Sequence, residues 1–115
     1  MERDQRKARV ALLGRIVRAV RQYRGEHQKP MAARGGIARE ELSMIEGGRY
    51  ALRDEHMRVS IAQCVGVEPA VVEGLLSEAQ VDPNALADAF AVPRPVIEAA
   101  LVVPPAKASA QGSAS

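Results

Sequence analysis

The chain has 115 residues, enough for one folded domain with a small appendage. Hydrophobic residues make up 47% of it and aromatic residues only 3%, so we expect a core of aliphatic side chains and an all-α fold. The single cysteine, Cys64, has no second cysteine with which to pair, and no apolar run reaches the roughly 18 residues of a transmembrane helix. The charged N-terminus is unlike a secretory signal, so a reducing, cytoplasmic setting is expected.

The formal net charge of +2 conceals an uneven distribution. Residues 1–58 contain fourteen Lys and Arg against eight Asp and Glu, a net of +6, whereas residues 59–115 contain two against six, a net of −4. This asymmetry predicts that a polyanion binds the N-terminal half of the chain. Charge alone is equally consistent with arginines that form a solvated helix face.

Periodic apolar residues predict a first helix from about residue 9 to residue 24, preceded by a charged arm at residues 1–8. Its apolar stripe consists of Val10, Leu13, Ile16, Val17 and Val20. Gly25 is expected to end this helix as a C-cap. Four further helices are predicted over residues 28–34, 38 to 47 or 48, 54–65 and 69–78, with Gly35-Gly36 as the turn between the second and the third.

The C-terminal part begins with Asp82-Pro83, an N-cap residue followed by proline at the first helical position. Two short helices are predicted from there, over residues 84–90 and 94–102, so residues 79–103 are interpreted as a helical pair. From residue 104 the chain consists mainly of Pro, Ala, Ser, Gly and Gln. Such a composition cannot bury enough apolar area to offset chain entropy, so residues 104–115 are predicted to be a disordered tail.

Residues 28–47 have the pattern of a helix-turn-helix, a motif that places its second helix in the DNA major groove. With Gln28 as the first position, Ala32 falls fifth, where a small side chain lets the two helices cross closely. Gly36 falls ninth, where the turn requires a positive φ that strains other residues. Apolar side chains at four positions would fill the angle between the helices: Met31, Ile37, Leu42 and Ile45. Because the motif lies in the basic half of the chain, DNA is the favoured polyanion.

Together with its flanking helices, the motif resembles the lambda-repressor-like, XRE-type helix-turn-helix family over about residues 12–76. The resemblance rests on an ordered series of positions: Arg24-Gly25, Gln28, Met31-Ala32, Arg34, Gly36-Ile37, Leu42-Ser43, Ile45-Glu46, Gly48-Arg49 and Ile61-Ala62 through Gly66-Val67. It implies a five-helix DNA-binding domain over residues 9–78, followed by a small C-terminal helical hairpin.

The resemblance also implies roles for nine residues in binding double-stranded DNA. Gln28 would hydrogen-bond a phosphate and brace the third helix. Four residues of that helix would face base edges in the major groove: Arg39, Glu40, Ser43 and Met44. Four cations would reach phosphates: Lys29, Arg34, Arg49 and Arg53.

Four positions depart from the family pattern. Ala38 stands where a Ser or Thr usually caps the third helix, which removes a cap worth about 1 kcal/mol. Glu40 and Glu41 are adjacent carboxylates, which either accept from a cytosine amine or only complement the positive N-terminal end of the helix. Arg58 occupies a position that is usually apolar, where Met57 is expected to substitute after a shift of the fourth helix.

No pattern in the sequence points to an enzyme, a cofactor or a small-molecule ligand. His27 and His56 have no cysteine or carboxylate cluster at metal-ligand spacing, so no zinc site is expected. Cys64 falls on an apolar helix face and is interpreted as a small core residue. Tyr23 and Tyr50 either donate to phosphates or pack half-buried.

The C-terminal helical pair allows several interpretations. Residues 86–94 resemble a degenerate helix-turn-helix, but Arg94 is the only donor on its second helix, and this half of the chain is acidic. The preferred interpretation is an apolar ledge made of Phe90, Val92, Val96, Ile97, Leu101 and Val103. This ledge either packs on the main bundle or forms a two-fold homodimer.

The sequence therefore predicts a sequence-specific, DNA-binding transcriptional regulator, in form a small repressor that occupies an operator. Its size and layout fit a phage or prophage immunity repressor, or a small host regulator, acting on the nucleoid of a bacterial cell or a phage-infected host. The alternative is a protein-interaction module, such as an antitoxin or antirepressor, that uses the C-terminal apolar ledge.

Overall fold

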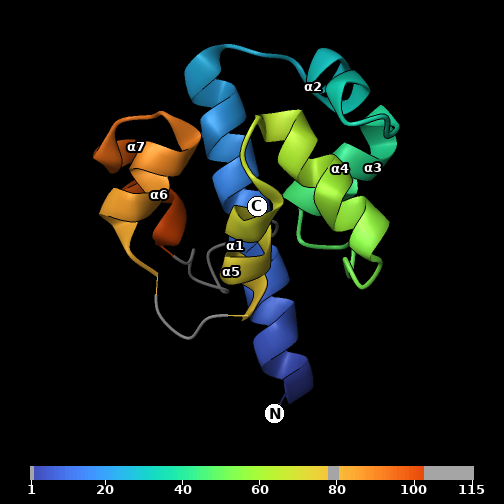
Figure 1. Ribbon diagram of the computed structural model, residues 1–115, viewed down its shortest axis with the longest axis horizontal. Helices are drawn as coiled ribbons and strands as arrows, with labels where there is room; N and C mark the ends of the chain where they lie inside the picture. The colour runs from blue at the N-terminus through green and yellow to red at the C-terminus, as the bar shows by residue number, and fades with distance from the viewer. Residues whose placement is uncertain (1, 78–80, 103–115) are drawn as a thin grey trace, which may run out of the picture.

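The computed structural model describes residues 2–77 and 81–102, and within them the chain forms seven α-helices and no strand (Figure 1). In chain order these are α1 (Glu2–Arg24), α2 (Gln28–Arg34), α3 (Arg39–Glu46), α4 (Glu55–Val65), α5 (Pro69–Ser77), α6 (Pro83–Phe90) and α7 (Arg94–Leu101). The expected all-α class is confirmed for these residues. The tail predicted over residues 104–115 lies outside them.

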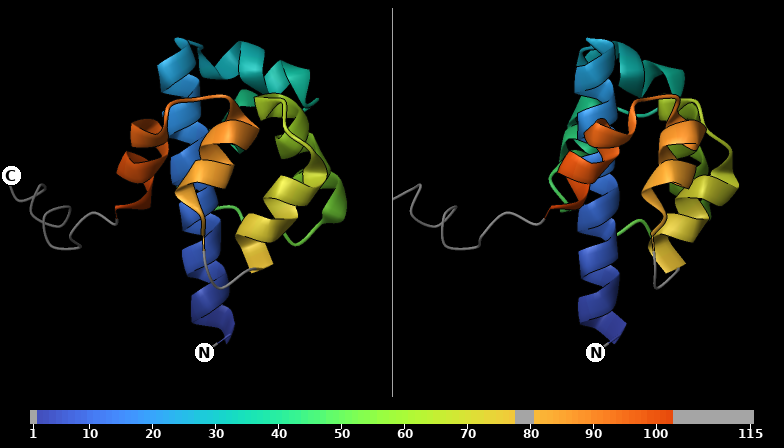
Figure 2. Two further views of the ribbon diagram at one scale, coloured as in Figure 1. Left: turned by 60° about the vertical axis from the view of Figure 1, so that its left-hand side comes forward. Right: turned by 90° about the vertical axis from the view of Figure 1, so that its left-hand side faces the viewer.

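Helix α1 runs through the middle of the fold, with the shorter helices arranged around it (Figures 1 and 2). Helices α3, α5 and α7 all pack against it. The predicted apolar stripe is buried over its whole length: Val10, Leu13, Ile16, Val17 and Val20. Because burying one such side chain stabilises a fold by about 1.5–3 kcal/mol, α1 is the organising element of the core.

Helix α1 begins at Glu2, seven residues before the predicted start, so residues 2–8 are helical and do not form a separate arm. The Arg, Lys, Gln and Ala residues that follow are good helix formers. In addition, Arg6 Nη2 donates to the carbonyl oxygen of Leu52 at 2.7 Å, which ties this turn to the loop after α3. Apolar periodicity alone does not reveal this extension.

The crossing of α1 and α3 depends on two glycines. A Cβ atom on Gly14 would collide with the backbone carbonyl oxygens of Ile45 and Glu46 at the end of α3. At Gly48, just beyond α3, an added Cβ atom would lie 3.1 Å from the Cα atom of Ala11. The absent side chains let the C-terminal end of α3 lie directly on α1, which fixes the face that α3 presents to solvent.

Helices α2 and α3 are joined by the turn that the sequence predicts. Gly36 has a φ of 72°, in the left-handed region where glycine is favoured. Four of the predicted core residues are completely or almost completely buried: Met31, Ala32, Leu42 and Ile45. Ile37 packs against them and is partly buried. Gly35 lies so close to α4 that a Cβ atom there would collide with Cys64 Sγ and the Ser60 carbonyl oxygen. The buried Cys64 is thus the small core residue expected.

Helices α4 and α5 cover a second side of α1. Asp54 Oδ1 accepts from the backbone N–H of His56 at 3.0 Å and so caps α4, which ends at Gly66 with a φ of 77°. The two helices bend by 117° relative to one another and bury their apolar faces in the core. Among the described residues no single helix is long and apolar enough to cross a membrane, and only this bent pair matches a span in combined length and composition.

Helix α7 packs on the remaining side of α1, and α6 packs on α7 (Figure 2). Arg15 Nε donates to the carbonyl oxygen of Ala100 at 2.9 Å and so caps the end of α7. Arg24 joins two helix ends, donating from Nη1 to the Val65 carbonyl oxygen at 2.9 Å and from Nη2 to the Phe90 carbonyl oxygen at 3.0 Å. These bonds fasten the C-terminal pair to the rest of the bundle.

The apolar ledge predicted on this pair packs inside the chain. Phe90 and Ile97 are completely buried and Val92 is almost so, while Val96 and Leu101 are partly buried. Val103, the last member of the ledge, lies outside the described residues. Of the two interpretations of the ledge, packing on the main bundle accounts for the buried members, and a homodimer through the partly exposed ones, Val96 and Leu101, stays a prediction. The apolar area of the ledge attaches α6 to α7 and α7 to α1.

Candidate nucleic-acid interface

The four residues predicted to read bases lie together on α3: Arg39, Glu40, Ser43 and Met44. The opposite side of α3 is formed by Leu42 and Ile45, which are completely buried. Arg39 and Glu40 keep 51% and 76% of their side chains exposed, and Met44 is 38% exposed. One short helix therefore presents a cation, a carboxylate, a hydroxyl and a thioether to solvent. These groups can contact a polar and partly apolar ligand surface.

The start of α3 is capped by Glu41 in place of a hydroxyl. Ala38 has no side-chain acceptor, as noted from the sequence, but Glu41 Oε1 accepts from the Ala38 backbone N–H at 2.8 Å. Glu41 thus satisfies a free N–H of the first turn and complements the helix dipole. Glu40 Oε2 lies 3.8 Å from Arg39 Nη2, and the Glu40 side chain stays exposed. The two adjacent carboxylates consequently have different environments.

A buried carboxylate organises the inner edge of α3. Glu46 accepts from Arg21 Nε at 2.7 Å and from Arg21 Nη2 at 3.0 Å. It also accepts from Gln28 Nε2 at 3.0 Å, and Gln28 Oε1 accepts from Arg39 Nη1 at 3.3 Å. The hydrogen bond to Glu46 raises the pKa of Arg21 above its ordinary value, against the opposing effect of burial. Gln28 is thereby held between the two ends of α3, as the predicted bracing role requires.

Arg34 lies apart from the other predicted phosphate-binding residues. Its guanidinium donates to Glu26 Oε1 at 2.7 Å and Oε2 at 2.9 Å, and to the Cys64 carbonyl oxygen at 2.9 and 3.2 Å. The hydrogen bonds from Arg34 lower the pKa of Glu26 below its ordinary value. These contacts join α2 to the segment before it and to the end of α4. Arg34 therefore has a structural role within the chain, and its expected phosphate contact stays a prediction.

Three arginines of the N-terminal half cap helix ends within the chain. Arg15 and Arg24 donate to the ends of α4, α6 and α7, as described above, and Arg9 Nη1 donates to the Leu75 carbonyl oxygen in α5 at 3.4 Å. Helix C-termini carry a partial negative charge, so cations are favoured there. Burial lowers the pKa of Arg15. Part of the charge asymmetry is thus explained by contacts at helix ends within the chain. Only the cations that make no such contact are left to bind an external polyanion.

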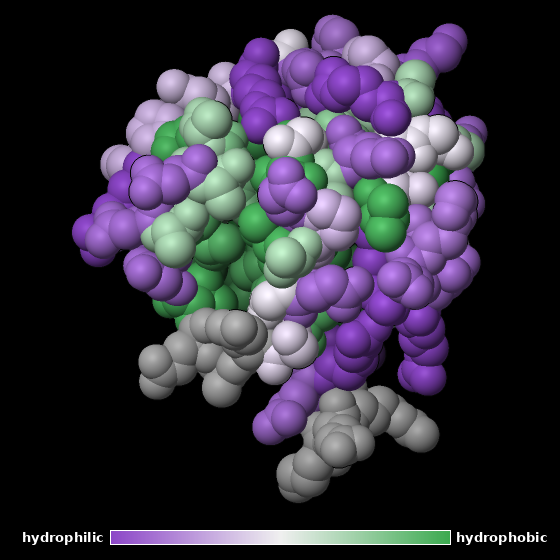
Figure 3. All heavy atoms as spheres, viewed as in Figure 1, coloured by the Kyte–Doolittle hydropathy of each residue, from purple (hydrophilic) through white to green (hydrophobic). Residues whose placement is uncertain are grey.

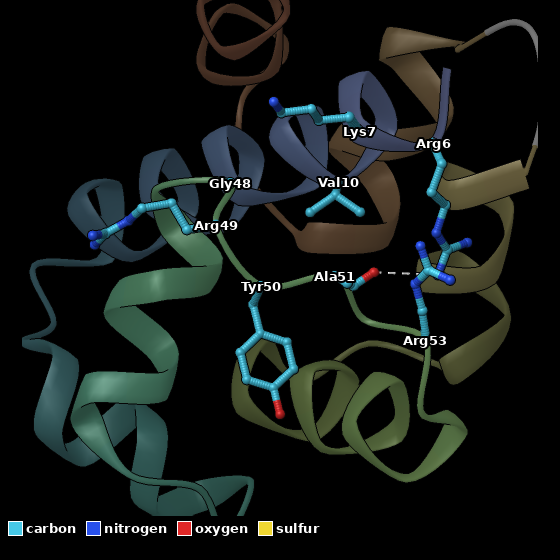
Figure 4. Close-up of a pocket in the computed structure, with 8 residues that line it drawn as sticks. All are labelled: Arg6, Lys7, Val10, Gly48, Arg49, Tyr50, Ala51 and Arg53. Carbon is cyan, nitrogen blue, oxygen red and sulfur yellow. Dashed lines mark hydrogen bonds between the residues drawn. The ribbon is translucent and has the colours of Figure 1, made fainter. Parts of the chain in front are cut away.

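Several of the remaining cations line two grooves that share Arg49. The first, which we call the α1–α3 groove, has a volume of about 300 Å³ and includes Arg18, Gln28 and Ser43. The second, the α1–loop groove, has a volume of about 400 Å³ and lies between α1 and the residues that follow α3 (Figure 4). Arg53 lines this second groove, whereas Lys29 is exposed at the start of α2. Of the predicted phosphate-binding cations, Arg49 is the one that connects the two grooves.

Four cations that line the grooves are absent from the residues predicted from the sequence: Arg6, Lys7, Arg18 and Arg21. The signal that places two of them is the helical period of α1. Lys7, Gly14 and Arg18 follow one another at spacings that share a helix face. Gly14 marks this face as the one that meets α3. Apolar periodicity begins only at Val10, so it does not place Lys7 on this helix face.

The two sides of the molecule differ in surface character. In Figure 3, hydrophobic side chains gather over α5 and α6, and hydrophilic ones dominate over α2, α4 and the N-terminal end of α1. An apolar groove of about 250 Å³, lined by residues such as Val71, Leu75 and Leu86, accounts for part of the hydrophobic side. Tyr50 packs partly buried against the core, whereas Tyr23 is exposed.

No group of His, Cys, Asp or Glu side chains within residues 2–77 and 81–102 is arranged to hold a metal ion. Comparisons of the chain with protein-family models, with curated proteins and with solved structures found no match.

Proposed function

We propose that this protein is a sequence-specific regulator that binds double-stranded DNA, with α3 as its recognition helix. The observation that carries the proposal is the division of α3 into a buried face, Leu42 and Ile45, and an outer face that bears Arg39 and Glu40. A protruding α-helix with polar side chains fits the B-DNA major groove, which is about 12 Å wide.

Each residue of the outer face has a chemical counterpart on base edges. Arg39 can donate to both acceptors of guanine, O6 and N7, and Glu40 can accept from the amine of cytosine. Ser43 can donate or accept, and Met44 offers an apolar surface to a thymine methyl group. This set would discriminate between base pairs, because the major groove displays a distinct pattern for each of them.

The hydrogen-bond chain behind α3 supports the same proposal. Arg21 holds Glu46, Glu46 orients the amide of Gln28, and Gln28 accepts from Arg39. A guanidinium that is already oriented loses less side-chain entropy on binding than a free one. This series of hydrogen bonds therefore holds the Arg39 side chain near one conformation before DNA is present.

In this proposal the protein acts as a small repressor that occupies an operator and excludes other proteins from it. The resemblance of residues 12–76 to lambda-repressor-like domains favours the phage or prophage immunity type among such repressors. The interaction-module alternative is not favoured, because its surface would be the ledge in which Phe90 and Ile97 are completely buried. A second DNA-reading unit at α6 and α7 is not favoured either. Its one candidate donor, Arg94, donates from Nε to Glu98 Oε2 at 2.6 Å and from Nη1 to Asn84 Oδ1 at 3.2 Å.

The proposal is tested by selecting duplexes from a randomised library with the full chain and measuring the enriched sites at about 50 and 200 mM salt. Neutralised phosphates release counterions, so binding of the enriched sequence should weaken steeply as salt rises. A palindromic motif would indicate two copies on one site, and an asymmetric motif a single copy. Absence of any enriched motif would overturn the proposal.

A further inference from the structure

Four cations from two separate parts of the chain face the α1–loop groove. Arg6 and Lys7 come from the first turns of α1, and Arg49 and Arg53 come from the segment after α3. Figure 4 shows Arg53 pointing toward Arg6 on one side of the groove, with Lys7 and Arg49 projecting on the other side of Val10. Only Arg6 and Arg53 thus converge, and cations that converge on a hollow raise the local electrostatic potential and attract an anion.

The Arg6 guanidinium is fixed in this position by the backbone. Its Nη2 group donates to the carbonyl oxygen of Leu52 at 2.7 Å and lies 3.4 Å from that of Ala51. A guanidinium has five N–H donors, so further donors remain for a ligand. Arg6 is therefore a preorganised donor, in contrast to an arginine that extends into solvent.

The loop that carries Arg53 is fixed as well. Leu52 is completely buried and has a φ of 57°, a left-handed conformation that costs a residue with a side chain about 1–2 kcal/mol. Arg58 Nη1 donates to the Leu52 carbonyl oxygen at 3.1 Å and to the Arg53 carbonyl oxygen at 2.9 Å, which holds the strained turn in place. The two arginines thus define the backbone from which Arg53 extends.

We infer that the α1–loop groove binds a phosphate group through Arg6 and Arg53, with Lys7 at its edge raising the positive potential. Guanidinium groups match phosphate oxygens in geometry, and Lys7 adds a point charge. The inference rests on the proposed function in one respect: the phosphate is a phosphodiester of the DNA backbone, beyond the bases that α3 contacts. Helix α1 then becomes a second DNA-binding element, and the bound duplex extends from the α1–α3 groove past Arg49 to Arg53.

The test compares Lys7→Gln and Arg53→Gln with the unchanged chain on an enriched duplex and on an unrelated duplex of equal length. Arg6 is left intact because it also supports Leu52. Arg94→Gln, which removes an exposed cation that does not line the groove, is the matched control. Each groove variant should weaken binding to both duplexes by a similar factor, about three- to tenfold, and reduce the slope of log K against log salt by about one. The control should leave both quantities unchanged.

A second arm uses inorganic phosphate in place of DNA and follows the Arg6 Nε–H and the backbone amides of residues 49–53 by NMR. Duplex binding that is unchanged in affinity and salt slope in both groove variants would overturn the groove inference and leave the proposed function standing. If the unchanged chain binds no duplex but phosphate shifts these signals, and Arg53→Gln removes the shifts, the groove is a free-phosphate site and the proposed function fails. No response to either probe would overturn both.

Discussion

Glu46 and Arg21 form a bidentate ion pair in which both side chains are almost entirely removed from solvent, with N–O distances of 2.7 and 3.0 Å. The pair ties the end of α3 to α1, and through Gln28 it reaches Arg39 at the start of α3. The stability of the fold and the orientation of the proposed recognition helix therefore depend on the same carboxylate.

Replacing one member of this pair should be much more harmful than replacing both. Glu46→Ala leaves a nearly buried guanidinium without its partner, and we expect the free energy of unfolding to fall by about 3–5 kcal/mol. The double variant Arg21→Met, Glu46→Leu leaves no unpaired charge and should recover most of that loss. Urea unfolding of the three proteins measures this. Equal stability of Glu46→Ala and the unchanged chain would mean that the pair contributes nothing.

Two glycines in helices should respond to alanine in opposite directions. Gly14→Ala places a Cβ atom against the carbonyl oxygens of Ile45 and Glu46, so we expect a loss of about 1–3 kcal/mol. Gly74→Ala meets no atom within 4 Å in α5, and it should stabilise the fold by about 0.5–1 kcal/mol because alanine is the better helix former. Thermal unfolding compares the pair. A Gly14→Ala protein as stable as the unchanged chain would contradict the close crossing of α1 and α3.

The contact between Glu26 and Arg34 predicts a specific acid dependence. The pKa of Glu26 is lowered in the folded state, mainly by its hydrogen bonds from Arg34. A lowered folded-state pKa stabilises the fold above the unfolded-state pKa, about 4.3, and that contribution is lost as the pH falls through the folded-state value. The unfolding free energy should therefore decrease more steeply below about pH 4.3 in the unchanged chain than in Arg34→Ala. Parallel pH profiles would show that this contact is not formed in solution.

The packing of α7 on α1 predicts that Ile97 acts within one chain. Ile97→Ala should lower the free energy of unfolding by about 2–5 kcal/mol through the cavity it leaves. Ala99→Ser on the exposed side of the same helix should change it by less than about 0.5 kcal/mol. Sedimentation of both variants should match that of the unchanged chain. A change of oligomeric state in Ile97→Ala, with the stability of the monomer unaltered, would instead support the dimer surface.

The parts of the fold that local chemistry determines were predictable from the sequence. The bounds of α2, the positive φ of Gly36 and the burial of Met31 and Leu42 all follow from turn requirements and helical period. The C-terminal pair was predicted to within one residue at each end, because Asp82 and Pro83 are strong start signals.

The assignment of individual arginines was not predictable in the same way. Nothing in the sequence around Arg21 and Arg34 indicates which residues they contact. In the structure Arg21 pairs with Glu46, whereas Arg34 pairs with Glu26 and with the end of α4. These partners depend on how helices distant in sequence cross, which periodicity does not specify. The same reason explains why Lys7 was assigned to an arm: its place beside Arg49 follows from the α1–α3 crossing.

The most direct test of the recognition-helix assignment is a library selection with three proteins: the unchanged chain, Arg39→Ala and Arg34→Ala. Arg39→Ala should lose preference at one base position, at a cost of about 1–3 kcal/mol for the enriched sequence. Arg34→Ala should retain the sequence preference of the unchanged chain, because its side chain is held by Glu26 and the Cys64 carbonyl oxygen. An Arg39→Ala protein that selects the same motif with the same affinity would contradict the assignment of α3 as the helix that reads DNA.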